Sequence, residues 1–173
     1  TGTLKDLIQL WLGECGASRY VPYEALAHEP LRAASQTVFG VNGIPAFRID
    51  RADFLLSFGA DFLETWLSPV EYSRQFAAFH APQAIGKNLF IHVGPRLSLT
   101  AANADHWLCV PLGTEYLVAL GMLRIILDEN LCKTLQPEHK RVLAVSVHDV
   151  SIESVLEKTG INQDTLRTLA KKF

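Results

Sequence analysis

Apolar residues along the chain follow two spacings, and the alternation between them predicts alternating helices and strands. Residues Glu29–Phe39 have the three-or-four-residue spacing of a helix. Residues Glu115–Leu127 are apolar nearly all round, which predicts a helix buried deep between layers. Phe54–Phe58 and Leu89–Val93 are short continuous apolar runs, which are typical of strands buried on both faces of a parallel sheet. Trp107–Val110 is a third, shorter run. The pattern predicts an α/β fold, with a mostly parallel Rossmann-like sheet flanked by helices.

The N-terminal stretch predicts a helix followed by a short strand. The apolar face of this helix consists of Leu4, Leu7, Ile8 and Trp11. Thr3 and Asp6 have the spacing of a capping box at its start. Gly13 and Gly16 are expected to end it. Arg19–Tyr23 is then predicted as a short strand.

Two later helices have clear signals at their ends. Pro30 lies in the first turn of the helix over Glu29–Phe39, and Gly40 is expected to stop it. Ser68 and Pro69 supply a cap and a first helical residue for another helix. The apolar face of that helix consists of Tyr72, Phe76 and Phe79.

The C-terminal stretch predicts one strand and two helices. Val142–Val147 is predicted as a strand, and a helix is predicted to begin near Ser151. A final helix carries an apolar stripe of Leu166, Leu169, Ala170 and Phe173. Because that stripe reaches the last residue without a stop signal, we expect residues 1–173 to be a single α/β domain, part of a larger multidomain protein.

Composition and charge exclude several classes of function. The formal net charge of -2 gives no electrostatic reason to expect nucleic acid as the ligand. No apolar run approaches the roughly 18 residues of a membrane span, so direct membrane insertion is not expected. The cysteines are Cys15, Cys109 and Cys132, and their apolar surroundings predict buried, reduced thiols. The histidines are scattered without metal-binding spacing, so we predict no metal ion held by this domain.

Three short segments follow the predicted strands, at the positions where parallel sheets bind ligands. Residues 59–66 begin with a glycine that permits a tight turn, and their acids can contact sugar hydroxyls or a base. Residues 94–100 place an arginine and a serine two positions apart, a pair that can bind a phosphate. Residues 111–115 place a threonine at a helix start, where free backbone N–H groups form an anion site.

Each segment also has an explanation that needs no ligand. The first fits a strand-to-helix turn with solvated acids. In the second, Arg96 fits an ion pair with a carboxylate such as Asp105. In the third, Thr114 fits a simple helix cap, and Glu115 is favourable at the positive end of a helix whatever the function. Taken singly, the segments leave both explanations open.

In combination and in order, the segments resemble the molybdopterin oxidoreductase family. The resemblance rests on the runs Pro95–Ser98, Ala104–Leu108, Pro111–Glu115 and Ala119–Gly121. The stretch Ser57–Tyr72 is similar to one branch of the family, which includes the large subunit of alternative complex III. The resemblance implies an α/β domain that binds molybdopterin guanine dinucleotide within an electron-transferring oxidoreductase, whose metal–dithiolene centre carries out the redox chemistry.

The resemblance also implies a set of site residues and partners. The implied cofactor-binding set is Gly59, Ala60, Asp61, Arg96, Ser98, Gly113, Thr114 and Glu115. No catalytic residue is assigned, because no acid, base or nucleophile forms a convincing constellation. The metal-ligating residue and any iron–sulfur cluster are expected outside this chain. The implied partners are other domains of the same protein, together with iron–sulfur and membrane subunits of a redox complex, so the parent protein is expected to be membrane-associated.

Three departures from the family pattern support an alternative. Gly94 stands where relatives often carry an acid, Leu112 where they carry a proline, and Asp61–Phe62 where many have an asparagine–proline turn. Gly94 and Leu112 favour a cofactor-free scaffold domain within a membrane-associated quinol-oxidising complex, whereas the intact Arg96, Ser98 and Gly113–Glu115 favour binding. A third hypothesis, an unrelated hydrolase or transferase, is weakened by the absence of a nucleophile elbow and of a phosphate-binding glycine loop.

Overall fold

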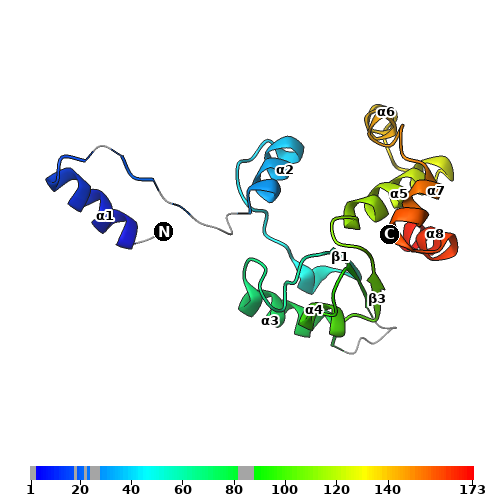
Figure 1. The fold of residues 1–173 in the computed structure, drawn as a ribbon, viewed down its shortest axis with the longest axis horizontal. Helices are drawn as coiled ribbons and strands as arrows, with labels where there is room; N and C mark the ends of the chain where they lie inside the picture. The colour runs from blue at the N-terminus through cyan, green and yellow to red at the C-terminus, as the bar shows by residue number, and fades with distance from the viewer. Residues whose placement is uncertain (1–2, 18, 22, 24–27, 82–87) are drawn as a thin grey trace. The chain divides into compact units, whose positions relative to one another are not determined.

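The computed structural model describes residues 3–17, 19–21, 23, 28–81 and 88–173. It divides the chain into two compact units, Thr1–Phe47 and Arg48–Phe173. The first unit contains the helices α1 (Thr3–Glu14) and α2 (Glu29–Phe39), labelled in Figure 1. The second unit contains the sheet and the remaining helices.

Helix α2 has the bounds that the sequence predicts. Proline lies in its first turn, and Gly40 ends it in the left-handed conformation with φ +70°.

The strand predicted over Arg19–Tyr23 is wrong for the residues that the structure describes, because 19–21 and 23 are not in a strand. Pro22 lies outside the described residues. An extended segment becomes a strand only where a neighbour supplies ladder hydrogen bonds, and apolar composition does not supply that neighbour.

The second unit alternates strands with helices in the predicted order. It begins with the short 3-10 helix η1 (Ile49–Arg51) and the strand β1 (Phe54–Phe58). Its other strands are β2 (Leu89–Gly94) and β3 (His106–Cys109). Its helices are α3 (Pro69–Phe79), α4 (Leu99–Ala102), α5 (Glu115–Asp128), α6 (Pro137–Ser146), α7 (Ile152–Thr159) and α8 (Gln163–Lys172).

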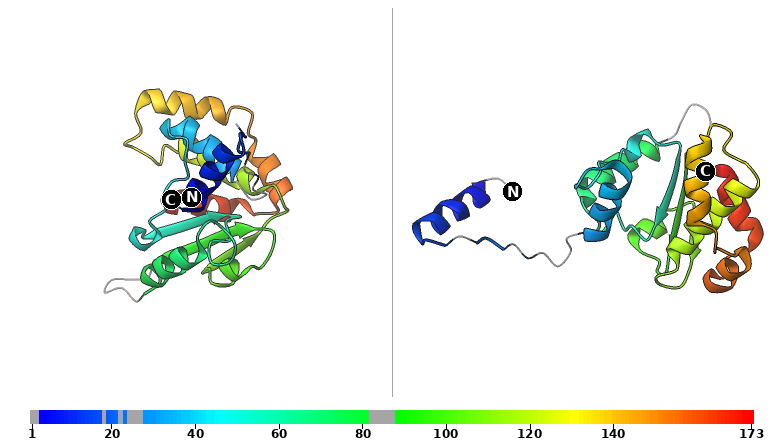
Figure 2. Two further views of the ribbon diagram at one scale, coloured as in Figure 1. Left: turned by 90° about the vertical axis from the view of Figure 1, so that its left-hand side faces the viewer. Right: turned by 90° about the horizontal axis from the view of Figure 1, so that it is seen from above.

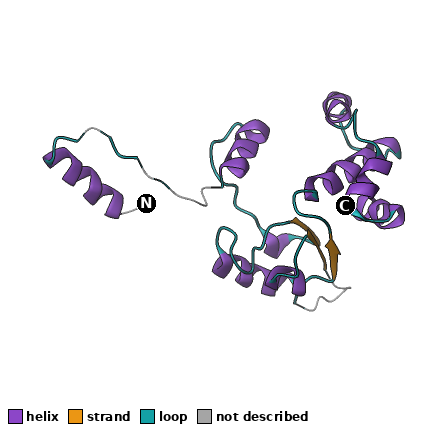
Figure 3. Cartoon of the chain, viewed as in Figure 1, coloured by secondary structure: helices purple, strands orange, loops and turns teal. Residues whose placement is uncertain are grey.

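The three strands form one parallel sheet in the order β1-β2-β3, drawn in orange in Figure 3. Phe58 pairs with Val93, and Gly94 pairs with Cys109, so the carboxyl ends of the three strands lie at the same edge. The predicted α/β class with a parallel sheet flanked by helices is therefore confirmed. Because all three strands run in the same direction, the segments that follow them are brought together.

Each face of the sheet packs against its own set of helices. Figure 2 shows α3 and α4 on one side of the sheet and α5, α7 and α8 on the other. On the second side, Ile91 and Val93 belong to an apolar core with residues of those helices. On the first side, Phe90 packs against Phe62 and Phe76, with ring centroids 5.5 Å apart in both pairs. The central strand is therefore buried on both faces, as its continuous apolar run predicts.

Close packing of α5 depends on a glycine. A Cβ atom at Gly121 would lie 3.0 Å from the Cγ1 atom of Val155 and 3.1 Å from the Cδ2 atom of Leu166. Both of these side chains are buried. Helix α5 is confirmed, but only its inner side is fully buried, whereas Tyr116 is 60% exposed. The glycine therefore lets α7 and α8 approach α5 closely.

The C-terminal half differs from the prediction at two places. Val142–Val147, predicted as a strand, lies in and just after helix α6, in which Val142 and Val145 are exposed. A short apolar run fits a helix as well as a strand. Here Pro137 lies in the first turn of α6, a position that favours the start of a helix. Phe173, the C-cap residue of α8, is 77% exposed, although its stripe neighbours Leu166, Leu169 and Ala170 are buried.

The thiols also differ from the prediction. Cys15, Cys109 and Cys132 are free, as predicted, but all three are exposed rather than buried. Cys109 is the last residue of β3 and lies at the edge of the sheet, and Cys15 follows the end of α1. Apolar sequence neighbours therefore do not place these small side chains inside a core.

No helix in the described part of the chain is both long enough and apolar enough to cross a membrane.

Candidate functional site

The three predicted segments meet at the carboxyl edge of the sheet. The N–H of Gly59, which follows β1, donates a hydrogen bond of 2.8 Å to the carbonyl of Val93 in β2. Gly59 has a φ of +63°, and a Cβ atom on it would lie 3.7 Å from the Oε1 atom of Glu115. Glu115 begins helix α5, beyond β3. We name this region the carboxyl-edge site, made of residues 59–66, 94–100 and 111–115.

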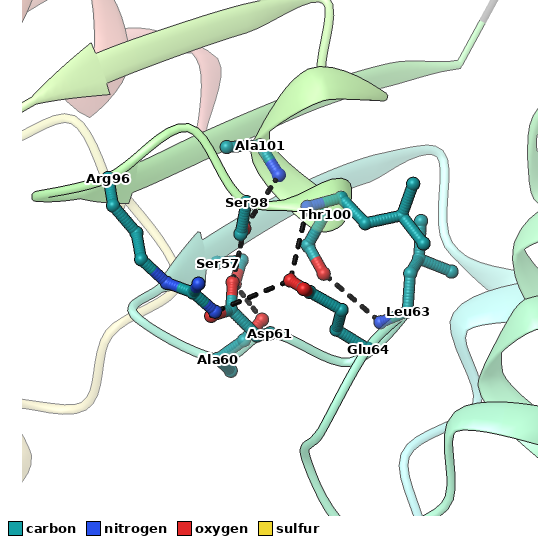
Figure 4. A network of polar contacts seen from close by, with 10 residues as sticks. Ser57, Ala60, Asp61, Leu63, Glu64, Arg96, Ser98, Thr100 and Ala101 are labelled. Atoms are coloured by element: carbon teal, nitrogen blue, oxygen red, sulfur yellow. Dashed lines mark hydrogen bonds and ion pairs between the residues drawn. The ribbon is translucent and has the colours of Figure 1, made fainter.

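Arg96 joins the first two segments by ion pairs. Its Nη2 atom lies 2.8 Å from the Oδ2 atom of Asp61 and 3.3 Å from the Oε2 atom of Glu64. The hydroxyl of Ser98 donates a hydrogen bond to the other carboxylate oxygen of Asp61. Figure 4 shows these side chains converging from two loops. The predicted residues Asp61, Arg96 and Ser98 are thus in direct contact with one another.

The alternative explanation of Arg96, an ion pair with a carboxylate of the protein, is confirmed, but Asp105 is the wrong partner. The Oδ2 atom of Asp105 instead accepts a hydrogen bond of 2.9 Å from the backbone N–H of Phe90. Asp105 therefore stabilises the junction of β2 with the start of β3, whereas Arg96 pairs with the acids after β1. Spacing along the sequence does not reveal this choice, because Asp61 is 35 residues before Arg96.

The turn after β1 is held by its own contacts. The carbonyl of Asp61 accepts hydrogen bonds from the N–H groups of Glu64, Thr65 and Trp66, at 3.0, 2.9 and 3.1 Å. The hydroxyl of Thr100 accepts a bond of 3.1 Å from the N–H of Leu63. The side chain of Asp61 is only 16% exposed, so it is not a solvated acid on a turn.

Glu64 and Thr100 lie in the predicted segments 59–66 and 94–100 but were not in the implied cofactor-binding set. The Oε2 atom of Glu64 accepts a bond of 3.1 Å from the N–H of Leu99, at the start of α4. Thr100 is fully buried, and its hydroxyl fastens the turn after β1 to α4. The pattern in the sequence that could have indicated both is the coincidence of acids after β1 with a Ser-x-Thr run after β2.

The third segment supplies a helix start without a side-chain cap. Thr114 is the N-cap residue of α5, but its hydroxyl donates a bond of 2.7 Å to the carbonyl of Pro111 and accepts none from the helix. The explanation of Thr114 as a simple side-chain cap is therefore wrong. Gly113 has a φ of +79°, and nothing lies within 4 Å of the place where its Cβ atom would be. The first turn of α5 thus keeps backbone donors that can face an anion.

His92 lies beneath the carboxyl-edge site and was missed at the sequence level. It is 2% exposed, and its Nδ1 atom is buried without a hydrogen-bond partner. A Cβ atom at Gly94 would lie 2.8 Å from its Nε2 atom. The absence of an acid at position 94 therefore has a steric reason, because His92 occupies the space that a side chain there would need.

The charges at the carboxyl-edge site are predominantly negative. Asp61, Glu64 and Glu115 contribute three carboxylates, and Arg96 contributes one guanidinium. Carboxylates accept hydrogen bonds from sugar hydroxyls and from the N–H groups of a base, and the start of α5 offers donors to a phosphate. The donor and acceptor set fits the nucleotide part of a dinucleotide cofactor, except that Arg96 is already paired within the protein.

A separate groove lies away from this edge. It has a volume of about 590 Å³ between strands β2 and β3 and helix α8. Its lining includes Trp107, Asp105 and Thr168, and none of the predicted cofactor-binding residues. No cluster of three or more metal-binding side chains occurs in the described ranges 3–17, 19–21, 23, 28–81 and 88–173.

The burial of His92 predicts a dependence of stability on pH. Burial lowers the pKa of His92, and the nearby charge of Asp61 opposes this effect. In the unfolded chain the pKa returns to about 6.5, so the unfolded state binds more protons as the pH falls through that value. The free energy of unfolding is therefore expected to decrease from about pH 7 towards pH 5, and to receive no contribution from His92 at higher pH.

Urea unfolding at several pH values measures this decrease, and His92→Gln is expected to show a shallower slope than the unsubstituted chain. His148→Gln is the matched control, because the side chain of His148 is 83% exposed. An unchanged slope in His92→Gln would show that His92 does not carry the effect.

The chain is similar to known proteins in sequence and in fold. The fold and the carboxyl-edge site define an α/β domain of the kind that binds ligands beyond the carboxyl ends of parallel strands. No protein-family model matches the chain. The chain is 30% identical, over 173 residues and 98% of its length, to the molybdopterin-binding-like subunit of menaquinone reductase from Nitratidesulfovibrio vulgaris. It is 27% identical over 120 residues to the molybdopterin-containing subunit of arsenate respiratory reductase from Shewanella sp. ANA-3.

A solved structure supports the same relationship. Acetylene hydratase from Pelobacter acetylenicus matches 70% of the chain with a TM-score of 0.53 and 25% sequence identity. The chain spans 24% of the menaquinone reductase subunit, 13% of the arsenate reductase subunit and 16% of the acetylene hydratase chain. Together these matches support the resemblance of the chain to the molybdopterin oxidoreductase family.

Proposed function

We propose that this chain is the domain of a molybdopterin-type oxidoreductase that binds the guanine dinucleotide part of the cofactor. The main support for this proposal is that residues 59–66, 94–100 and 111–115 converge at one edge of a parallel sheet. Similarity over 98% of the chain to a subunit named as molybdopterin-binding-like supports the same function. When bound, the cofactor supplies the metal–dithiolene centre for electron or atom transfer.

Different residues of the chain would contact different parts of the cofactor. The backbone at Gly59–Ala60 and Gly113–Thr114 would lie against the nucleotide, and the start of α5 would donate hydrogen bonds to phosphate oxygens. The carboxylates of Asp61 and Glu115 would accept bonds from ribose hydroxyls or base N–H groups. Ser98 would hold Asp61 in place, and Arg96 would pair with its carboxylate. The chain thus orients the cofactor and is not expected to contain a catalytic residue.

The rest of the proposed assembly lies outside this chain. The metal-ligating residue and any iron–sulfur cluster would be held by other domains of the parent protein. We propose iron–sulfur and membrane subunits of a redox complex as its partners, and therefore a membrane-associated parent. The similarity to a subunit of a menaquinone reductase supports this part of the proposal.

A second candidate function is a cofactor-free scaffold domain in such a complex. The observation that favours it is that Asp61, Arg96 and Ser98 are hydrogen-bonded to one another. In addition, His92 excludes an acidic side chain at position 94. In this case the family fold would serve assembly, and the carboxyl-edge site would hold no nucleotide.

Metal and nucleotide content of the full-length protein distinguishes the two functions. We expect about one molybdenum or tungsten atom per polypeptide, together with guanine nucleotide released by acid hydrolysis. Glu115→Ala is expected to lower the guanine content by at least about half, because a polar contact to the nucleotide is lost. Glu157→Ala, an exposed position on α7, is the matched control. A protein with neither metal nor guanine would support the scaffold instead.

A further inference from the structure

The members of the Arg96 network are not held equally. Asp61 is fixed by Ser98 and by the three N–H groups bound to its own carbonyl, and Glu64 is fixed by the N–H of Leu99. The side chain of Arg96 is 61% exposed, and among the described residues its guanidinium forms ion pairs with Asp61 and Glu64. The carboxylates therefore stay in place if the guanidinium moves, and Arg96 is the movable member.

Both ion pairs use the same nitrogen of Arg96. Asp61 and Glu64 each accept from Nη2, which leaves Nε and Nη1 with no hydrogen bond to another described residue. A guanidinium has five donor hydrogens, so a phosphate can still approach Arg96 from another side. An anion that does so comes close to two fixed carboxylates, and their repulsion opposes its attraction to Arg96.

Resting on the proposed function, we propose that Glu64 sets the anion affinity of the carboxyl-edge site by holding Arg96 beside Asp61 and repelling a phosphate there. Asp61 alone would balance the charge of Arg96, whereas Glu64 gives the three side chains a net charge of -1. The phosphate part of the cofactor is then bound mainly at the start of α5, and free inorganic phosphates are disfavoured at Arg96. Glu64 is in this way a residue that determines specificity.

The sharpest test replaces Glu64 by glutamine. Glu64→Gln removes one negative charge, while the amide oxygen can still accept the hydrogen bond from Leu99. The probe is inorganic pyrophosphate, titrated calorimetrically into the 173-residue chain at low salt. We expect the variant to bind pyrophosphate ~3- to 10-fold more tightly than the unsubstituted chain, with the difference shrinking as salt is added.

Two further variants locate the effect. Glu157→Gln changes the net charge by the same amount on α7 and is expected to leave the affinity unchanged. The double variant Glu64→Gln with Arg96→Ala is expected to lose the added affinity, because the guanidinium that attracts the anion is gone. Thermal unfolding of each variant, together with Glu64→Ala as a second neutral side chain, separates a charge effect from damage to the loop.

Each outcome decides the proposal. Tighter binding in Glu64→Gln and Glu64→Ala, but not in Glu157→Gln, supports it. Equal or weaker binding in both Glu64 variants overturns it, as does a complete absence of pyrophosphate binding by the unsubstituted chain and the variants. The proposed function is judged separately by metal and guanine in the full-length protein. A loaded protein whose Glu64 variants bind pyrophosphate no better would therefore retain its function and lose this inference.

Discussion

Replacing Phe90 by alanine is expected to lower the free energy of unfolding by about 3 to 5 kcal/mol. Phe90 is completely buried in the central strand β2. Its ring lies 5.5 Å from those of Phe62 and Phe76 and 6.4 Å from that of His92. Alanine would leave a cavity among side chains that are themselves almost fully buried, so the structure has few means of filling it. Denaturation in urea, followed by circular dichroism, measures the loss.

Phe173→Ala is the matched control for this substitution. The same side chain is removed at a position that is 77% exposed, so the free energy of unfolding is expected to change by less than about 0.5 kcal/mol. Equal losses for the two variants would contradict the packing described for β2. Because Phe62 directly follows Asp61, the loss at Phe90 should also loosen the turn that carries the carboxyl-edge site.

The central part of the fold was predictable from the sequence because its signals are local and strong. Phe54–Phe58 and Leu89–Val93 are short apolar runs with a glycine immediately after each, and the structure forms strands there. The failures have a different origin. Val142–Val147 is also short and apolar, but helix α6 covers all of it except Val147, and a proline begins the first turn of that helix.

The candidate site was predictable only in part, for a similar reason. Parallel strands bring the segments that follow them to one edge, so the convergence of residues 59–66 with 94–100 follows from strand order. The pairing of Arg96 with Asp61 and Glu64 does not, because it depends on the path of a turn set by backbone hydrogen bonds. The importance of His92 cannot be predicted from the sequence. It depends on the space that the imidazole occupies beside Gly94, two residues further along β2.

This difference affects how the family resemblance is interpreted. A motif identifies which residue types occur in order, whereas the structure shows whether they face a ligand or one another. At the carboxyl-edge site both occur: the start of α5 is open, and Arg96 is paired. The substitutions at Asp61 and Arg96 measure how much of this network serves the stability of the domain.

Asp61→Ala is expected to lower the free energy of unfolding by about 2 to 3 kcal/mol. The side chain of Asp61 is 16% exposed, and its loss leaves the hydroxyl of Ser98, which is 4% exposed, without its acceptor. Asp149→Ala is the matched control, because that carboxylate is 98% exposed, and little change is expected there. Chemical denaturation of both variants measures the difference.

Arg96→Ala separates the two kinds of contact that Asp61 makes. The side chain of Arg96 is 61% exposed, so water and salt screen its ion pairs, and its loss is expected to be much smaller than that of Asp61→Ala. A small loss for Arg96→Ala with a large one for Asp61→Ala means that the buried bond from Ser98 holds the loop. Arg96 is then free to move without unfolding the site, which agrees with its place as the movable member of the network. Equal losses would instead mean that the ion pairs of Arg96 are needed to hold the loop.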